Sequence, residues 1–148
     1  MAEGIFNRLH HICIVVHDVE KTVKYYESIG VGPWPEYPPL TDYSSLNVPH
    51  LEGFMQAKYR VCNISNMQIQ LLEPGPGTPQ AKFLAEKGEG VYHLGFEVDD
   101  CDAGEAQGVA MGLKILSTGR RPNGSGFTYF DNADEAGVVL EIRQSPNQ

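Results

Sequence analysis

The chain contains one strand-like stretch twice, and this repeat constrains the fold more than any other feature. Residues 9–18 read LHHICIVVHD and residues 91–100 read VYHLGFEVDD. Aligning His11 with His93 also aligns the aspartates that close the two copies. Both copies are rich in β-branched or aromatic residues and end in acidic turn residues, which is typical of strands. The repeat predicts two similar modules that share one sheet system.

A second strand-like stretch follows each copy further along the chain, at residues 67–74 (MQIQLLEP) and 137–143 (GVVLEIR). Residues 74–79 read PGPGTP, a breaker-rich linker that marks the natural module boundary. We therefore expect module one at about residues 8–74 and module two at about 90–145. A chain of 148 residues is expected to form a single domain, 1–148, with a substantial core.

Each module also has a helical stretch after its first strand. Asp18 is placed to cap the first helix, which ends before Gly30. The expected elements are a helix at 19–29, strands at 57–63 and 67–72, a short helix at 80–87, a helix at 101–111, a short strand at 114–117, a flexible basic loop at 119–126 and strands at 127–131 and 138–143.

Residues 32–54 interrupt this pattern in the first module. Prolines at positions 33, 35, 38, 39 and 49 argue against a regular helix and a central strand, because both need the N–H that proline lacks. Four aromatic residues punctuate the segment: Trp34, Tyr37, Tyr43 and Phe54. Long irregular segments in compact domains are often functional. We expect these four residues to form a wall or lid of a substrate site that favours an apolar or aromatic group; the alternative is that they fill the edge of the core.

The composition excludes several classes of partner. The formal net charge is −8, whereas nucleic-acid binding depends on lysine and arginine side chains that neutralise phosphates. No apolar run approaches the roughly 18 residues of a membrane span, and no signal-peptide-like segment is evident. Cys13, Cys62 and Cys101 are odd in number and form no CxxC pair, which favours reduced thiols and a cytoplasmic protein. A small-molecule substrate, with neither nucleic acid nor membrane, remains as the expected partner.

Four polar residues occupy equivalent strand positions in the two modules: His11, Gln70, His93 and Glu141. Side-chain alternation places each of them opposite a face rich in Ile, Leu, Val or Phe. If a pseudo-twofold axis relates the modules, the four side chains converge on it. Two imidazoles, an amide oxygen and a carboxylate suit a borderline divalent metal. The alternative is that each is a solvated residue on a half-exposed strand.

The segments HHICIVVHD, QIQLLEP, YHLGFEVDD and YFDN…GVVLEI resemble the vicinal oxygen chelate superfamily, which includes glyoxalase I, bleomycin-resistance proteins and extradiol dioxygenases. The nearest branch is that of methylmalonyl-CoA epimerase-like proteins, and the resemblance covers roughly residues 8–145. It implies an α+β fold in which two paired βαβββ modules form a cupped, eight-stranded mixed sheet with helices on the outer face. It also implies one divalent metal ion (Zn, Co, Ni, Mn or Fe) in the cup. The ligand positions of the family fall on His11, Gln70, His93 and Glu141.

The chain departs from the epimerase pattern where the base is expected. Epimerases carry a catalytic glutamate on a first-module strand, in the region where this chain has residues 32–54. Glu52 is one candidate base and Glu97, on the histidine-bearing face of its strand, is another; a solvated strand glutamate is the competing interpretation. Arg120 and Arg121 are candidates for holding a substrate carboxylate or phosphate at the rim, against a role as solvated loop residues.

These observations favour a metal-dependent isomerase, epimerase or glyoxalase-like lyase that acts through a metal-stabilised enolate on a small carbonyl or acyl-CoA-like substrate. One alternative is an Fe(II) extradiol-type dioxygenase in which the glutamine does not ligate. Another is a non-catalytic resistance protein that binds a small aromatic molecule, although the intact ligand set weighs against it. By analogy with the family, we expect a homodimer.

Overall fold

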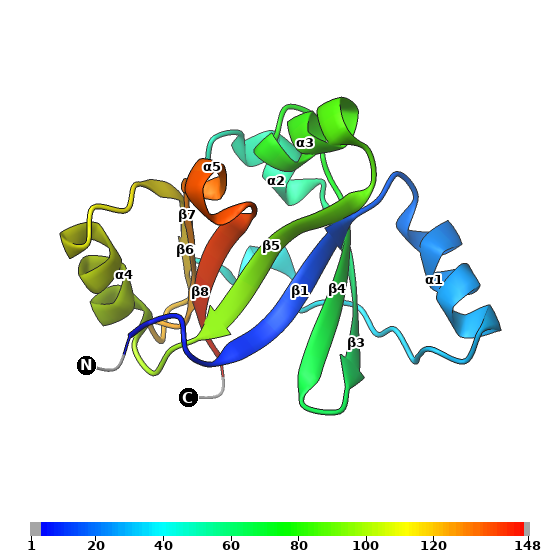
Figure 1. Ribbon diagram of the computed structural model, residues 1–148, viewed down its shortest axis with the longest axis horizontal. Coiled ribbons are helices and arrows are strands. Elements are labelled where there is room, and N and C mark those ends of the chain that lie inside the picture. The colour runs from blue at the N-terminus through cyan, green and yellow to red at the C-terminus, as the bar shows by residue number, and fades with distance from the viewer. Residues whose placement is uncertain (1–3, 147–148) are drawn as a thin grey trace.

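One eight-stranded mixed sheet organises the computed structural model, which describes residues 4–146 (Figure 1). The strands are β1 (Leu9–Val15), β2 (Ser45–Asn47), β3 (Lys58–Ile64), β4 (Met67–Glu73), β5 (Gly90–Glu97), β6 (Ile115–Arg120), β7 (Gly126–Phe130) and β8 (Val139–Gln144). The helices are α1 (Val19–Ser28), α2 (Leu51–Met55), α3 (Pro79–Lys87), α4 (Cys101–Ala110) and α5 (Ala133–Ala136), with a 3₁₀ turn at Leu40–Asp42. The strand order is β2-β6-β7-β8-β5-β1-β4-β3. The expected α+β fold with an eight-stranded mixed sheet is confirmed.

Two central strands relate the halves of the sheet. β1 and β5 pair antiparallel at the centre, and each has a parallel neighbour on its other side, β4 beside β1 and β8 beside β5 (Figure 1). The register pairs His11 with Gly95 and Cys13 with His93. The two histidines of the repeat therefore lie diagonally across the central strand pair.

The repeated aspartates begin the two longest helices. The Asp18 carboxylate accepts a hydrogen bond from the Lys21 N–H at the start of α1, and the Asp100 carboxylate accepts one from the Ala103 N–H at the start of α4. Such N-caps contribute about 1 kcal/mol each. The repeat thus encodes a whole unit of strand, turn and capped helix in each module.

Helices α1 and α4 pack on one face of the sheet. Val19 and Val23 of α1 belong to a cluster with Leu71, and α4 meets Phe130 and Ile142 in another. Along that face, α1 lies by β3 and β4 in one half of the sheet and α4 lies by β7 and β8 in the other half (Figure 1). Because strand side chains alternate, the residues next to Leu71 and Ile142 in sequence, Gln70 and Glu141, point to the opposite face, called the inner face below.

The second strand of module one is displaced from its expected place. β2 pairs antiparallel with β6 of module two. The half of the sheet that belongs to module one therefore contains three of its own strands, β1, β4 and β3. Within residues 4–146, the place beside β3 holds one bridge, between Glu36 and Arg60, and a hydrogen bond from the Val61 N–H to the Pro35 carbonyl. The prolines of this segment cannot donate backbone hydrogen bonds, which explains why no longer strand forms there.

Three local expectations differ from the structure. The segment 32–54 includes most of a short helix, α2, which begins after Pro49 and is capped by the His50 imidazole, an acceptor for the Gly53 N–H. The strand predicted at 114–117 extends to Arg120 as β6, because its alternation continues along the β7 ladder. The basic segment that follows, predicted to be a loop, forms a turn in which the Gly124 N–H donates to the Arg121 carbonyl.

None of the helices within residues 4–146 is long and apolar enough to cross a membrane. The three cysteines are free and buried.

Candidate metal centre

Three side chains from three strands meet on the inner face. His11 Nε2 lies 2.9 Å from His93 Nε2 and 3.0 Å from Glu141 Oε1, while His93 Nε2 lies 3.8 Å from Glu141 Oε2. One ligand atom from each residue falls within 4.8 Å of the others. All three are buried, at 1%, 0% and 4% exposure. The structure thus brings together three of the four residues that strand alternation placed on one face.

A glycine makes room for the His11 ring. Gly95 is the direct partner of His11 across the β1–β5 pair, and a Cβ built at Gly95 would overlap the His11 imidazole. The β1–β5 register is also irregular between Leu9 and His11. The irregularity and the missing side chain together let His11 lie over the sheet beside His93.

The electrostatics of the cluster match a cation site. Burial, and secondarily Arg143, lowers the pKa of His11 to about 3, and burial lowers the pKa of His93 to about 3 as well. Both imidazoles are therefore neutral at physiological pH, which is the state that ligates metals. Burial raises the pKa of Glu141, whose charged form lacks a full counter-ion. A divalent ion among these groups would compensate that carboxylate.

Unpaired polar atoms point to the same interpretation. Among residues 4–146, the buried side-chain atoms without a hydrogen-bond partner are His93 Nδ1 and Glu141 Oε1. Glu141 Oε1 lies 3.0 Å from His11 Nε2, yet the contact lacks hydrogen-bond geometry. Buried polar groups are normally satisfied, so the open carboxylate oxygen fits a ligand atom for a metal.

Gln70 lies next to this cluster. It pairs with Cys13 across β1 and β4, and Cys13 pairs with His93 on the other side, which sets the three residues in one row across the sheet. Gln70 is buried, and its amide nitrogen donates to Gln68 Oε1 at 2.8 Å. Its amide oxygen remains available as a fourth ligand atom, and that role stays a prediction.

A cavity on the inner face, called the cup below, contains these groups. Its wall includes His11, Gln70 and Glu141, four tyrosines (Tyr37, Tyr43, Tyr59, Tyr129), Arg121, Arg143, Leu40, Phe54, Gly126 and Phe127. Of the predicted aromatic residues, the structure thus places three in the cup. Tyr37 and Tyr43 are joined through their hydroxyls at 3.3 Å, and Phe54 stacks on Phe127.

Trp34 does not join the cup. It packs against Tyr26 in the cluster formed by α1 and the opposite face of the sheet, and its indole N–H donates to the Val31 carbonyl. Its place as a substrate wall was therefore a wrong expectation.

Sequence reasoning missed Tyr59 and Tyr129. Tyr59 is the β3 partner of Leu72, on the same face as Gln70, and Tyr129 is the β7 partner of Glu141. Both positions follow from hairpin register, so alternation applied to the two hairpins would have found them. Burial first, and the negative charge of the neighbouring Glu141 as well, raise the pKa of Tyr129.

The two predicted bases lie outside the cup. Glu52 is exposed on α2. Glu97 accepts hydrogen bonds from Arg143 Nη1 at 2.7 Å and from the Ser145 N–H at 3.0 Å. Arg143 also donates to His10 Nε2 at 3.0 Å. Glu97 therefore belongs to a polar chain behind the centre. Within the described part of the chain, Glu141 is the one carboxylate that lines the cup.

The two predicted anion-binding arginines point in different directions. Arg120 forms ion pairs with Asp102 at 2.8 Å and Glu105 at 3.2 Å, both on α4. Arg121 lies in the wall of the cup, with its guanidinium carbon 4.5 Å from the centroid of the Tyr43 ring. The anion-binding expectation for Arg120 was wrong, because consecutive residues at the end of a strand face opposite sides.

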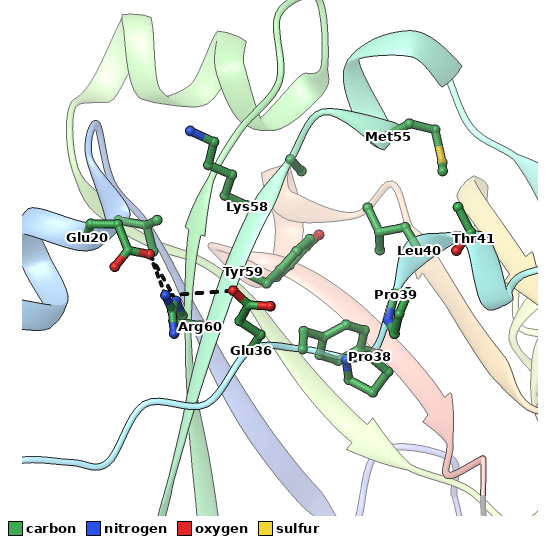
Figure 2. A pocket seen from close by; sticks show the side chains of 13 residues that line it. Glu20, Glu36, Pro38, Pro39, Leu40, Thr41, Met55, Lys58, Tyr59 and Arg60 are labelled. Atoms are coloured by element: carbon green, nitrogen blue, oxygen red, sulfur yellow. Dashed lines mark hydrogen bonds and ion pairs between the residues drawn. The ribbon is translucent and has the colours of Figure 1, made fainter.

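An open groove adjoins the cup along β3. Tyr37, Leu40 and Tyr59 line both the cup and the groove, which has a volume of about 330 Å³. Arg60 lines the groove and forms ion pairs with Glu20 at 2.9 Å and Glu36 at 3.8 Å; Figure 2 shows these three side chains together. The prolines 38 and 39 form part of the opposite wall (Figure 2). The groove is thus a second compartment that shares three side chains with the cup.

Comparisons with known proteins agree with this geometry. Residues 10–130 match the family model described as Glyoxalase/Bleomycin resistance protein/Dioxygenase superfamily. The human mitochondrial methylmalonyl-CoA epimerase is 28% identical over 142 residues, which cover 93% of this chain and 74% of that protein. An ethylmalonyl-CoA/methylmalonyl-CoA epimerase of Cereibacter sphaeroides is 25% identical over 145 residues, which cover 95% of this chain and 99% of that protein.

Among solved structures, a variant of Streptomyces coelicolor methylmalonyl-CoA epimerase in complex with 2-nitronate-propionyl-CoA superposes with a TM-score of 0.71. It is 28% identical, and the match covers 95% of this chain and 99% of that one. The family match spans most of the chain and includes the strands that carry His11, Gln70 and His93. The chain belongs to the glyoxalase/bleomycin resistance protein/dioxygenase superfamily.

Proposed function

We propose that the protein is a divalent-metal-dependent isomerase or epimerase, or a glyoxalase-like lyase, that acts through a metal-stabilised enolate on a small carbonyl or acyl-CoA-like substrate. The observation that carries the proposal is the buried convergence of His11, His93 and Glu141 in a chain whose curated relatives are epimerases. Gln70 completes the proposed ligand set. Zn, Co, Ni, Mn and Fe are all compatible with these donors.

The residues of the chain have distinct roles in this proposal. His11, His93 and Glu141, with Gln70, would hold the ion, which supplies Lewis-acid polarisation of a substrate carbonyl when bound. With one carboxylate and three neutral ligands, the loaded centre keeps a net positive charge that favours an enolate. Burial raises the pKa of Tyr43 and Tyr129, so their hydroxyls stay protonated and can donate hydrogen bonds into the cup.

Neither predicted base lines the cup. Glu97 could accept a proton only with its Arg143 contact broken. Glu52 is exposed on α2, away from the cup. The tyrosines are suited to donation rather than abstraction, because burial disfavours their ionised form.

A second candidate function is an Fe(II) extradiol-type dioxygenase. The observation that favours it is the two-histidine, one-carboxylate set itself, which is the ligand pattern of non-haem Fe(II) oxygenases. The lack of a free carboxylate in the described wall of the cup points the same way. A non-catalytic protein that binds small molecules remains as the third interpretation, and it predicts no turnover of any kind.

One experiment separates these candidates. Protein loaded in turn with Co, Zn, Ni, Mn or Fe(II) is incubated in D₂O with methylmalonyl-CoA, from which the epimerase relatives take their names. Exchange of the hydrogen on the α-carbon for deuterium is followed by NMR. Deuterium incorporation that depends on the metal supports the epimerase proposal. Oxygen uptake with a catechol by the Fe(II) form, without deuterium exchange, would instead support the dioxygenase. A homodimer and a cytoplasmic location stay predictions.

A further inference from the structure

His10 is the residue that β1 leaves out of its pairing with β5. The register pairs Leu9 with Phe96 and then His11 with Gly95, so no residue of β5 lies opposite His10. A bulge of this kind re-aims a side chain and often occurs next to functional sites. Here it brings the His10 imidazole behind a candidate metal ligand, with His10 Nδ1 at 2.8 Å from His11 Nδ1.

The far side of the His10 ring faces a cation. Arg143 Nη1 lies 3.0 Å from His10 Nε2 and also donates to Glu97 Oε1 at 2.7 Å. A guanidinium group can only donate hydrogen bonds, so His10 Nε2 must accept the one from Arg143. His10 therefore carries a single ring proton, on Nδ1, and this N–H points at His11. The tautomer is assigned from the donor pattern around the ring.

The same direction of donation continues into the candidate metal centre. Because His11 Nδ1 accepts from His10, the neutral His11 ring carries its proton on Nε2. That N–H points at His93 Nε2, 2.9 Å away. His93 thus accepts at Nε2 and carries its own proton on Nδ1, a buried atom that has no hydrogen-bond partner within residues 4–146.

The two histidines of the centre are therefore prepared differently for a metal ion. A neutral histidine ligates through its unprotonated ring nitrogen. His93 Nε2 is already unprotonated, whereas His11 Nε2 holds a proton where the ion would bind. Metal-binding histidines almost always donate their other ring N–H to an acceptor. His11 instead has a donor, His10, behind it.

We propose that His10 is a positioning residue of the metal centre, which controls through its own tautomer whether His11 can act as a ligand. When His11 ligates, the proton on its Nε2 leaves to solvent and the proton on His10 Nδ1 passes to His11 Nδ1. His10 Nε2 then takes up one proton from solvent, so the total number of ring protons is unchanged. Arg143 gives up His10 in this step and keeps its contact with Glu97. The inference rests on the proposed function for the ion, while the tautomers of the metal-free chain stand on the hydrogen bonds alone.

Long-range ¹H–¹⁵N correlation spectra test the proposal, because they distinguish the two neutral tautomers of each imidazole. Chelator-treated and zinc-loaded protein are compared at pH 7.0. On zinc loading, we expect His11 to change from the Nε2–H to the Nδ1–H form and His10 to change from Nδ1–H to Nε2–H. His93 should keep the Nδ1–H form in both samples. His50, whose Nδ1 accepts the Gly53 N–H, is the internal reference for a fixed Nε2–H tautomer.

Two substitutions of His10 form a matched pair. Asp and Asn have almost the same shape, but a carboxylate only accepts hydrogen bonds, whereas an amide can still donate. His10→Asp should give metal-free His11 the Nδ1–H form and lower the Kd for zinc roughly ten- to a hundredfold. His10→Asn keeps a donor toward His11, because Arg143 attracts the amide oxygen, and should retain the Nε2–H form and a Kd close to that of wild type.

The Kd is measured by competition with a chromophoric chelator, and circular dichroism confirms the fold of both variants. A new carboxylate also attracts zinc by its charge, so the tautomer of His11 in the metal-free variant decides between the two causes. Three results would each overturn the proposal: metal-free wild type with His11 in the Nδ1–H form, a His10 tautomer that zinc does not change, or an Nε2–H form of His11 that persists in His10→Asp. Failure of wild type to retain zinc would count against the proposed function, while the metal-free spectra would still decide whether His10 sets the tautomer of His11.

Discussion

The imidazole of His11 lies over Gly95, its direct neighbour on the adjacent antiparallel strand, where a single added carbon would overlap the ring. The position of a candidate metal ligand therefore depends on the absence of a side chain on a different strand. The two residues belong to the two halves of the repeat, so the centre needs both modules in one fixed register.

Gly95→Ala should displace the His11 ring and lower the affinity for zinc at least about tenfold, an effect typical of disturbed metal-site geometry. The measurement is competition with a chromophoric chelator, with circular dichroism to confirm the fold. Gly90→Ala is the matched control, since this glycine lies on the same strand and a Cβ there meets nothing within 4 Å. Equal affinities for the two variants would show that the space over Gly95 does not position His11.

Substitutions of Gln70 test the fourth ligand. Gln70→Leu should weaken metal binding, whereas Gln70→Glu should retain the metal and lower turnover, because a second carboxylate removes the net positive charge that stabilises an enolate. Metal content and α-carbon exchange are measured for both variants. Gln68→Leu is a useful comparison, as it removes the acceptor of the Gln70 amide nitrogen without removing the Gln70 oxygen. Normal metal binding and exchange by Gln70→Leu would make Gln70 a bystander and strengthen the three-ligand dioxygenase alternative.

The metal-free protein should lose stability as the pH falls from 7 to 5. In the folded chain, burial lowers the pKa of His11 and His93 to about 3, against about 6.5 for an exposed imidazole. Between these values the unfolded chain binds more protons than the folded one, so the free energy of unfolding decreases as the pH falls below about 6.5. The raised pKa of Glu141 acts in the opposite direction, but it involves one group against three, because burial and Arg143 also lower the pKa of His10 to about 4.

The measurement is the urea midpoint of chelator-treated protein at pH 7.0, 6.0 and 5.0, above the range in which most exposed carboxylates titrate. His93→Gln removes one of the two imidazoles and should show a smaller decrease across this range. A wild-type midpoint that is constant from pH 7.0 to 5.0 would contradict the assignment of both imidazoles as buried and neutral.

Much of this site could be predicted because it lies on strands. Alternation alone put His11, Gln70, His93 and Glu141 on one face, and the repeat put them at equivalent places in the two halves. Tyr59 and Tyr129 were equally accessible to that argument through hairpin register and were simply missed.

Irregular backbone explains the errors. Trp34 lies on the outer face because it packs against Tyr26 of α1. The periodicity of the sequence does not predict such a contact. The crossing of β2 to pair with β6 likewise depends on a long-range contact between modules. The sequence analysis treated Arg120 and Arg121 as one basic pair. The structure separates them, because Arg120 is the last residue of β6 and pairs with α4, whereas Arg121 follows the strand and lines the cup.

The most direct test of the account is the metal content of the protein itself. The chain and its His93→Ala variant are purified without added metal, offered equimolar zinc, freed of excess by gel filtration and analysed by inductively coupled plasma mass spectrometry. The account predicts about one equivalent of divalent metal per wild-type chain, a small fraction of that in His93→Ala, and a folded protein in both cases. A wild-type chain that retains no divalent metal, or a His93→Ala chain that retains as much as wild type, would contradict a metal centre at His11, His93 and Glu141.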